Sequence, residues 1–221
     1  MEQRDDRILD HIGLYRVSLR AVLARVFFEG GNPGNVVQRL LDEGFIRSRR
    51  LRGRLHYYQL TGLGASRRGF SRKRTARLGA QSLHGHLAAL WFCCLTGKER
   101  HRLERARLVS LFGSKTPSGK HCIERDEGHR VYRLFVAGAR TDDANLLHRL
   151  ERYIDAVRRR PVLGDWIANR QYAFAILTEE SRRVEVLRGA VMRHDLNRLA
   201  HVHVEWAPGY RNIGEALRAI Q

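Results

Sequence analysis

Cysteines and long apolar runs are scarce in this chain. Its 221 residues include only three cysteines, and two of them, Cys93 and Cys94, are adjacent. This number and spacing exclude the disulfide framework typical of small secreted domains. No apolar run approaches the roughly 20 residues that a membrane-spanning helix needs, and the acidic start at residues 2–6 is unlike a signal peptide. We therefore expect a cytoplasmic protein without a membrane partner.

Acidic residues are missing from one long stretch. The net charge is +18, yet residues 1–46 have six Arg against seven Asp or Glu. Residues 47–77 have eleven Lys or Arg and no acid, whereas residues 78–221 have 24 basic and 16 acidic residues. Like charges repel one another unless a polyanion neutralises them, and this stretch lacks the apolar face of a membrane-surface helix. The charge distribution therefore favours a nucleic-acid partner that contacts residues 47–77.

The basic stretch begins with a predicted hairpin. Residues 46–51 and 55–60 have the composition of short strands, and Arg52-Gly53-Arg54 joins them. Glycine suits such a tight turn because it adopts positive φ without strain. Three helices are predicted before the hairpin, from apolar spacing over residues 4–14, 18–28 and 33–43.

Helix-boundary signals agree with this order. Ser18 is predicted as an N-cap, Pro33 as the first residue of the third helix and Gly44 as its left-handed C-terminal residue. Three helices followed by a basic hairpin predict a winged helix-turn-helix over residues 1–70, with helix 33–43 as the recognition helix and hairpin 46–60 as the wing. Winged helices also serve as protein-interaction modules, so an acidic protein partner is a further hypothesis.

The residues predicted to contact double-stranded DNA share exposed positions on these elements. Asn and Gln side chains pair with adenine and Arg pairs with guanine in the major groove, while wing arginines suit phosphates. The predicted DNA-binding residues are Asn32, Asn35, Gln38, Arg39, Arg47, Arg49, Arg50, Arg52, Arg54, His56, Arg72, Lys73 and Arg74. By analogy with other winged-helix DNA binders, we also expect a homodimer.

Residues 71–81 are predicted to be a basic linker, and residues 82–221 a second domain. The second domain begins with a buried helix over 82–95. Hairpin strands are then predicted at 121–125 and 130–136, further strands at 172–177 and 202–206, and helices at 143–159, 181–192 and 213–220. This order predicts an α/β sandwich around a mixed sheet, and hence an α/β (α+β) fold class for the chain.

The sequence resembles the replication-relaxation family of plasmid and mobile-element proteins. The similarity lies in residues 36–46, in the wing exit 58–64, in His86 within an apolar helix, and in residues 132–136 before a long Arg-rich helix. The resemblance implies a winged helix joined to a domain related to restriction endonucleases. It further implies a role in plasmid mobilisation, replication control or transcription regulation, with the protein associated with the nucleoid or a plasmid.

Catalytic and metal signals are weak. Endonuclease chemistry of this kind needs an acidic residue on one strand and an Asp/Glu-x-Lys pair on the next, but residues 134–138 lack both acid and lysine. The candidate carboxylates for a metal-dependent nuclease or relaxase, which is the alternative function, are Glu124, Asp126, Asp142 and Asp143. Turn and helix-cap roles explain these residues more simply, so we expect a second domain that is catalytically inactive or that serves interaction and dimerisation.

Histidines and cysteines occur near one another without a standard zinc spacing. His84-x-His86 precedes Cys93-Cys94 and His101, and His201-x-His203 alternates with valines on a predicted strand. We therefore predict no metal and no cofactor.

Among the functions considered, binding to double-stranded DNA is the leading hypothesis.

Overall fold

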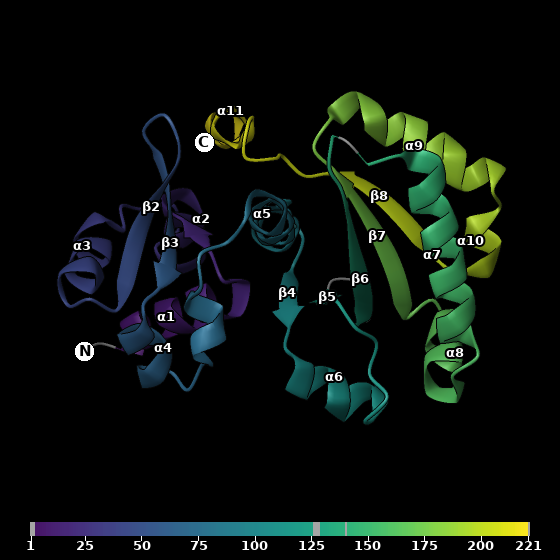
Figure 1. The fold of residues 1–221 in the computed structure, drawn as a ribbon, viewed down its shortest axis with the longest axis horizontal. Helices are drawn as coiled ribbons and strands as arrows, with labels where there is room; N and C mark the ends of the chain where they lie inside the picture. Colours follow the sequence, from purple (N-terminus) through teal and green to yellow (C-terminus); the bar gives the residue numbers. More distant parts are fainter. Residues whose placement is uncertain (1–2, 126–128, 140, 221) are drawn as a thin grey trace. The chain divides into compact units, whose positions relative to one another are not determined.

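The computed structural model describes residues 3–125, 129–139 and 141–220. The described chain forms two compact units, and Figure 1 shows their helices and strands. Unit 1 comprises residues 1–96 and 209–221, and unit 2 comprises residues 97–208. These limits differ from the sequence-based domains 1–70, 71–81 and 82–221, because the buried helix after residue 79 and the last helix both belong to unit 1.

Unit 1 contains the predicted helices and hairpin in the predicted order. Its three-stranded antiparallel sheet has the strand order β1-β3-β2. The elements are α1 (Gln3–Tyr15), β1 (Ser18–Leu19), α2 (Arg20–Phe27), α3 (Gly34–Asp42), β2 (Ile46–Arg52), β3 (Leu55–Leu60), α4 (Gly62–Arg67), the 3₁₀ helix η1 (Arg72–Thr75), α5 (Ala80–Cys94) and α11 (Ile213–Ala219).

The core of unit 1 forms where the apolar faces of its elements meet. Ile8, Leu9 and Ile12 of α1 pack with Val36, Val37 and Leu40 of α3 and with Ile46, Tyr58 and Leu60 of the hairpin. These residues have the helical and alternating spacings on which the prediction rested. The packing fixes α3 and β2–β3 as one body.

Two boundary predictions are wrong in detail. Ser18 does not cap a helix, because its backbone belongs to β1 and pairs with Tyr58. Its side chain instead contacts His11, with 3.1 Å between Oγ and the ring Nε2. Pro33 is the N-cap of α3 rather than its first helical residue.

The end of α3 is specified by a glycine. Gly44 has a φ of 71°, its N–H donates to Leu41, and the N–H of Phe45 donates to Leu40. This pair of hydrogen bonds is a Schellman motif, which only a residue at positive φ completes without strain. The sequence prediction for Gly44 is confirmed.

Unit 2 is built on a mixed five-stranded sheet, so the α/β class and the mixed sheet predicted from sequence are confirmed. The strand order is β4-β5-β6-β7-β8, antiparallel from β4 to β6 and parallel from β6 to β8. The elements are β4 (Arg100–Leu103), α6 (Arg105–Phe112), β5 (Lys120–Glu124), β6 (Arg130–Ala137), α7 (Asp143–Arg158), α8 (Pro161–Ala168), β7 (Tyr172–Thr178), α9 (Ser181–Arg193), α10 (Leu196–Leu199) and β8 (Val202–Trp206).

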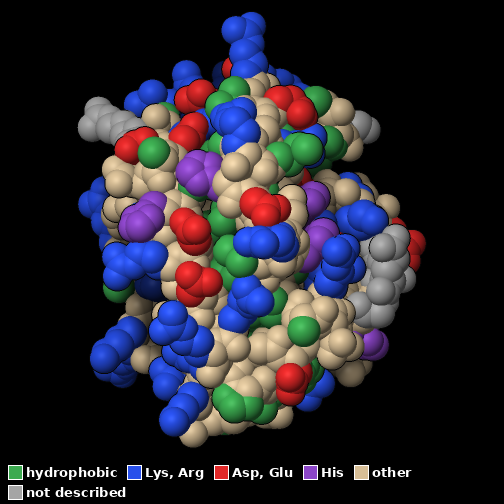
Figure 2. All heavy atoms as spheres, turned by 90° about the vertical axis from the view of Figure 1, so that its right-hand side faces the viewer, with side chains coloured by type: hydrophobic (Ala, Val, Ile, Leu, Met, Phe, Trp, Pro, Cys, Tyr) green, Lys and Arg blue, Asp and Glu red, His purple; other side chains and the backbone are tan. Residues whose placement is uncertain are grey.

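The two parallel crossovers place their helices on one face of this sheet. Figure 1 shows α7, α8, α9 and α10 together on that face, as expected for successive crossovers of the same hand. The apolar core beneath them includes Phe135, Tyr172, Phe174 and Val204. Figure 2 views this helical side, where basic side chains are interspersed with acidic and apolar ones.

The buried residue His121 also lies in unit 2. Its Nε2 is 2.8 Å from the Tyr172 hydroxyl. Burial, together with the positive charge of Arg133, lowers the pKa of His121 to about 3. The imidazole is therefore neutral in the folded protein at physiological pH.

None of the helices in the described part of the chain combines the length and apolar character needed to cross a bilayer.

Candidate nucleic-acid interface

The hairpin tip is a basic and exposed part of unit 1. Gly53 has a φ of 55°, so the two-residue turn Gly53-Arg54 requires the glycine that the sequence supplies. Arg50, Arg52 and Arg54 are exposed, as is His56, which pairs with Arg50 across the strands. The pairing register shifts between Arg50 and Arg52, a β-bulge that changes the direction of the side chains near the tip.

The arginines at the base of the hairpin have structural partners. Arg47 donates to the carbonyl of Thr75, and Arg49 donates to the Gln59 side chain at 3.0 Å. Burial, with the positive charge of Arg49, lowers the pKa of Arg47. Arg47 thus connects the hairpin to η1, and Arg49 connects its two strands, whereas the residues nearer the tip are exposed.

Acidic residues of α1 neutralise other arginines of the basic stretch. Asp10 accepts a bidentate pair of hydrogen bonds from Arg68, at 2.7 and 2.6 Å. Asp6 lies 3.3 Å from Arg68 and 3.6 Å from Arg67. The hydrogen bonding that Arg68 donates to Asp10 raises the pKa of Arg68. The counter-charges that residues 47–77 lack are thus partly supplied by residues far earlier in the chain.

The predicted recognition helix has a mixed set of side chains. Asn35 and Gln38 are exposed, and Gln38 donates to Asp42 at 2.8 Å. Arg39 instead forms a 2.6 Å ion pair with Asp5, whose side chain is fully buried. The structure therefore gives Arg39 a role in holding α3 against α1.

Asn32 is placed at the N-terminus of this helix. Its Oδ1 accepts from the Gly34 N–H at 2.8 Å and from Arg20 at 2.7 Å. The side chain therefore satisfies one of the unpaired N–H groups at the start of α3. This arrangement connects α2 with the beginning of the candidate recognition helix.

The segment predicted as a linker packs against α1. Arg74 donates to the carbonyl of Gly13 at 2.8 Å and lies over the ring of Phe70. The Phe70 ring passes close to the backbone of Gly13. A Cβ added at Gly13 would lie 2.1 Å from this ring, so the close approach requires glycine. Arg72 and Lys73 remain exposed on η1. Of the three basic residues predicted here, two face solvent and one anchors the segment.

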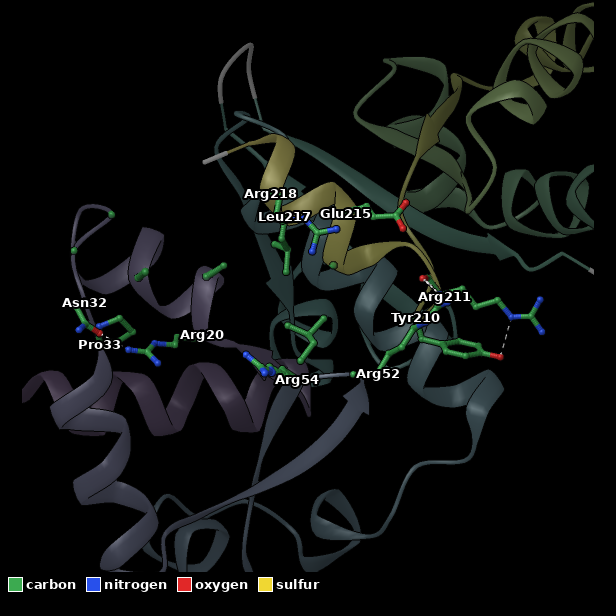
Figure 3. Close-up of a pocket in the computed structure, with 17 residues that line it drawn as sticks. Arg20, Asn32, Pro33, Arg52, Arg54, Tyr210, Arg211, Glu215, Leu217 and Arg218 are labelled. Carbon is green, nitrogen blue, oxygen red and sulfur yellow. Dashed lines mark hydrogen bonds between the residues drawn. The ribbon is translucent and has the colours of Figure 1, made fainter.

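The C-terminal helix forms a groove with the hairpin tip. The groove has a volume of about 710 Å³ and lies between α2, the loop before α3, the hairpin tip and residues 210–218, all in unit 1 (Figure 3). Arg52 donates to the carbonyl of Arg211, which connects the tip to the C-terminal segment. The basic residues that line the groove are Arg20, Arg52, Arg54, Arg211 and Arg218.

Sequence reasoning missed three of those five arginines. Arg20 lies in the nearly neutral N-terminal stretch, and Arg211 and Arg218 lie more than 150 residues after the hairpin. A charge count along the chain cannot find them, because only folding brings α2 and residues 210–218 beside the hairpin tip.

The candidate carboxylates of unit 2 do not form one site. Glu124 ends β5 and pairs in register with Arg130 at the start of β6, whereas Asp142 and Asp143 follow the other end of β6. Asp142 is the N-cap of α7 and accepts from the Ala144 N–H, and Asp143 pairs with Arg183. Asp126 lies outside the described residues.

Glu124 is instead part of a charged network on the sheet face opposite the helices. Arg100 donates to Glu124 at 2.6 Å and to Glu205 at 3.1 Å. The Tyr132 hydroxyl lies 3.4 Å from Glu124, and His203 lies 2.8 Å from Glu205. Burial lowers the pKa of Arg100, but the attraction of Glu205 and the hydrogen bond to Glu124 outweigh it, so the pKa is raised overall.

In this network the carboxylates of Glu124 and Glu205 both accept hydrogen bonds from the guanidinium of Arg100. A metal site needs carboxylate oxygens that converge on a vacant position, whereas here they converge on Arg100. Within residues 3–125, 129–139 and 141–220, no group of three His, Cys, Asp or Glu side chains is placed to hold a metal ion. The alternating histidines behave as predicted, since Val202 and Val204 are buried and His201 and His203 lie on the other face.

Comparison with known proteins adds no assignment. No family model, curated protein or solved structure matches this chain. The resemblance to the replication-relaxation family therefore stays a prediction, as do the plasmid-related role and the homodimer.

Proposed function

We propose that unit 1 is a winged helix-turn-helix module that binds double-stranded DNA. Helix α3 would enter the major groove with Asn35 and Gln38 toward the bases, and the β2–β3 hairpin would act as the wing. The proposal rests on three helices and a hairpin packed in one core, in the order that such modules have.

One observation carries the proposal. Within the basic stretch, Arg67 and Arg68 have acidic partners from α1, but the hairpin tip has none among the described residues. Arg50, Arg52 and Arg54 are exposed on a two-stranded support. Arg50 donates to the Gly53 carbonyl and Arg52 to the Arg211 carbonyl, which leaves their positive charges without an acidic counter-charge. Phosphate groups of DNA are the polyanion that such a surface suits, and contacts of this kind give affinity without reading sequence.

The experiment is a titration of a fluorescent 30-base-pair duplex at several salt concentrations. The affinity of the full chain should fall steeply with salt. Replacing Arg52 and Arg54 with Ala should reduce the slope by about 0.9 for each phosphate that the variant no longer neutralises. Arg182→Ala is the matched control, because Arg182 is an exposed arginine on α9 of unit 2. It should leave the slope unchanged.

Two results would contradict the proposal. If the full chain has no measurable affinity for duplex DNA at low salt, the module does not bind DNA, and an acidic protein partner becomes the better explanation of its charge. If the Arg52→Ala/Arg54→Ala variant keeps the wild-type slope, the hairpin is not the contacting element.

A further inference from the structure

We propose that the groove between the hairpin tip and α11 holds the sugar–phosphate backbone of DNA, so that the C-terminal segment forms part of the interface. This inference rests on the proposed function and extends it to Arg20 and Arg218. Neither residue belongs to the predicted recognition helix or wing. Figure 3 shows Arg20, Asn32 and Pro33 on one side of the groove, α11 with Arg218 and Leu217 on another, and Arg52 and Arg54 of the hairpin tip below α11.

The charge of the groove favours an anion. Five arginines and one carboxylate, Glu215, line it. Arg54 and Arg218 form no hydrogen bond or ion pair with any described residue, whereas Arg20 is held by Asn32 and Arg52 by the Arg211 carbonyl. Guanidinium groups remain charged at any physiological pH and donate in a geometry that matches phosphate oxygens. The groove therefore contains two guanidinium groups held in place by hydrogen bonds and two that are available to bind an anion.

The remaining lining favours a sugar–phosphate chain over a bare phosphate ion. Small and apolar residues separate the arginines, including Ala21, Ala24, Leu55 and Leu217. Apolar carbons of this kind suit deoxyribose, while the guanidinium groups suit the phosphates on either side of it. The volume of about 710 Å³ falls in the range of roughly 300–1,000 Å³ that ligand sites occupy.

The position of the groove agrees with the proposed docking of α3. The loop before α3 and Pro33, its N-cap, form one wall, and the hairpin tip forms another. DNA lying along α3 and touching the tip would pass its backbone between these two walls. The C-terminal segment would then contact the same strand from the third side.

Two single substitutions with opposite expected effects test the inference. Arg218→Ala removes an unpaired positive charge and should weaken binding to the 30-base-pair duplex several-fold, reducing the salt slope by about 0.9. Glu215→Gln removes the one negative charge of the groove and should strengthen binding. Both sites are exposed on α11, and thermal melting should confirm that the variants are folded.

The outcomes separate this inference from the proposed function. If Arg52→Ala/Arg54→Ala lowers the slope while Arg218→Ala and Glu215→Gln match wild type, the wing binds DNA and the groove does not. If neither the wild type nor any variant binds the duplex, the proposed function itself fails. A free nucleotide is the other source of phosphate: titration with ATP that shows binding dependent on Arg218, with unchanged duplex affinity, would also overturn the inference.

Discussion

The Arg39 guanidinium of α3 donates a 2.6 Å hydrogen bond to the buried carboxylate of Asp5 on α1. The other Asp5 oxygen, Oδ1, has no hydrogen-bond partner among the described residues. The buried negative charge of Asp5 is therefore balanced by the guanidinium of Arg39. The interaction joins the candidate recognition helix to the helix that it packs against, so the orientation of α3 and the charge of Asp5 are coupled.

Loss of this ion pair should destabilise unit 1. Arg39→Ala leaves a buried carboxylate without its partner, and such changes cost about 3–5 kcal/mol; the partial exposure of Arg39 places the expected cost at the lower end. Urea unfolding followed by circular dichroism measures it. The double variant Asp5→Asn/Arg39→Ala should recover part of the loss. Equal stability of Arg39→Ala and wild type would show that the pair contributes nothing.

The wing exit contains two glycines with opposite expected responses to alanine. An added Cβ on Gly64 would lie 2.1 Å from the Phe45 carbonyl oxygen, whereas one on Gly62 would meet nothing within 4 Å. Thr61 explains this closeness, because its hydroxyl donates to the Gly44 carbonyl at 2.6 Å and accepts from the Gly64 N–H at 3.1 Å. The hairpin exit is thereby held against the end of α3.

Gly64→Ala should therefore lower the melting temperature, since backbone must shift to admit the methyl group. Gly62→Ala should be neutral or slightly stabilising, by at most about 1 kcal/mol, because alanine favours a helix more than glycine does. Differential scanning fluorimetry compares the two. Similar melting temperatures for both variants would contradict the close approach at Gly64.

Two buried histidines should make the fold sensitive to acid. The pKa values of His11 and His121 are both lowered from 6.5 to about 3, and burial is the main cause for each. Below about pH 6.5 the unfolded chain gains protons that the folded chain does not take up. The free energy of unfolding should therefore fall by about 1.4 kcal/mol per pH unit for each histidine, until the pH approaches about 3.

Urea denaturation at pH 7, 6, 5 and 4 measures this dependence. His11→Gln removes one titrating group from unit 1 and should flatten the slope there, and His121→Gln should do so in unit 2. An unchanged pH slope in either variant would show that the corresponding histidine is not the source.

The Arg100 network should matter for stability rather than for catalysis. Arg100→Met leaves Glu124 and Glu205 without their guanidinium, and breaking a buried pair costs about 3–5 kcal/mol. Replacing both carboxylates with Gln in the same variant should restore much of the stability. Chemical denaturation compares the three proteins. Nicking of supercoiled DNA with Mg²⁺ that depends on Glu124 would instead support the nuclease hypothesis.

Local patterns in the sequence predicted much of the fold. Apolar spacing located α3 and alternation located β8, because burial on one face imposes these periods. A continuous apolar run located β7, which is buried on both faces. Gly44 and Gly53 were predictable from the positive φ that their turns require. The strand β4 was missed, because its four residues, Arg100–Leu103, carry no alternating apolar pattern and become a strand through pairing with β5.

The candidate interface was less predictable for a related reason. An arginine count cannot distinguish Arg54, which faces solvent, from Arg68, which Asp10 neutralises, because the acid lies 58 positions earlier in the chain. Ser18 likewise has the residue type of an N-cap, and only its pairing with the distant Tyr58 makes it a strand residue. Such long-range partners decide the role of a side chain and leave no local signal.

The return of residues 209–220 to unit 1 has a consequence for synthesis of the chain. A ribosome completes residues 97–208 before it makes α11, so unit 2 can fold while unit 1 still lacks one of its helices. Ile213, Ala216 and Leu217 become buried only afterwards. The groove beside the hairpin tip can therefore form only after the whole second unit has been translated.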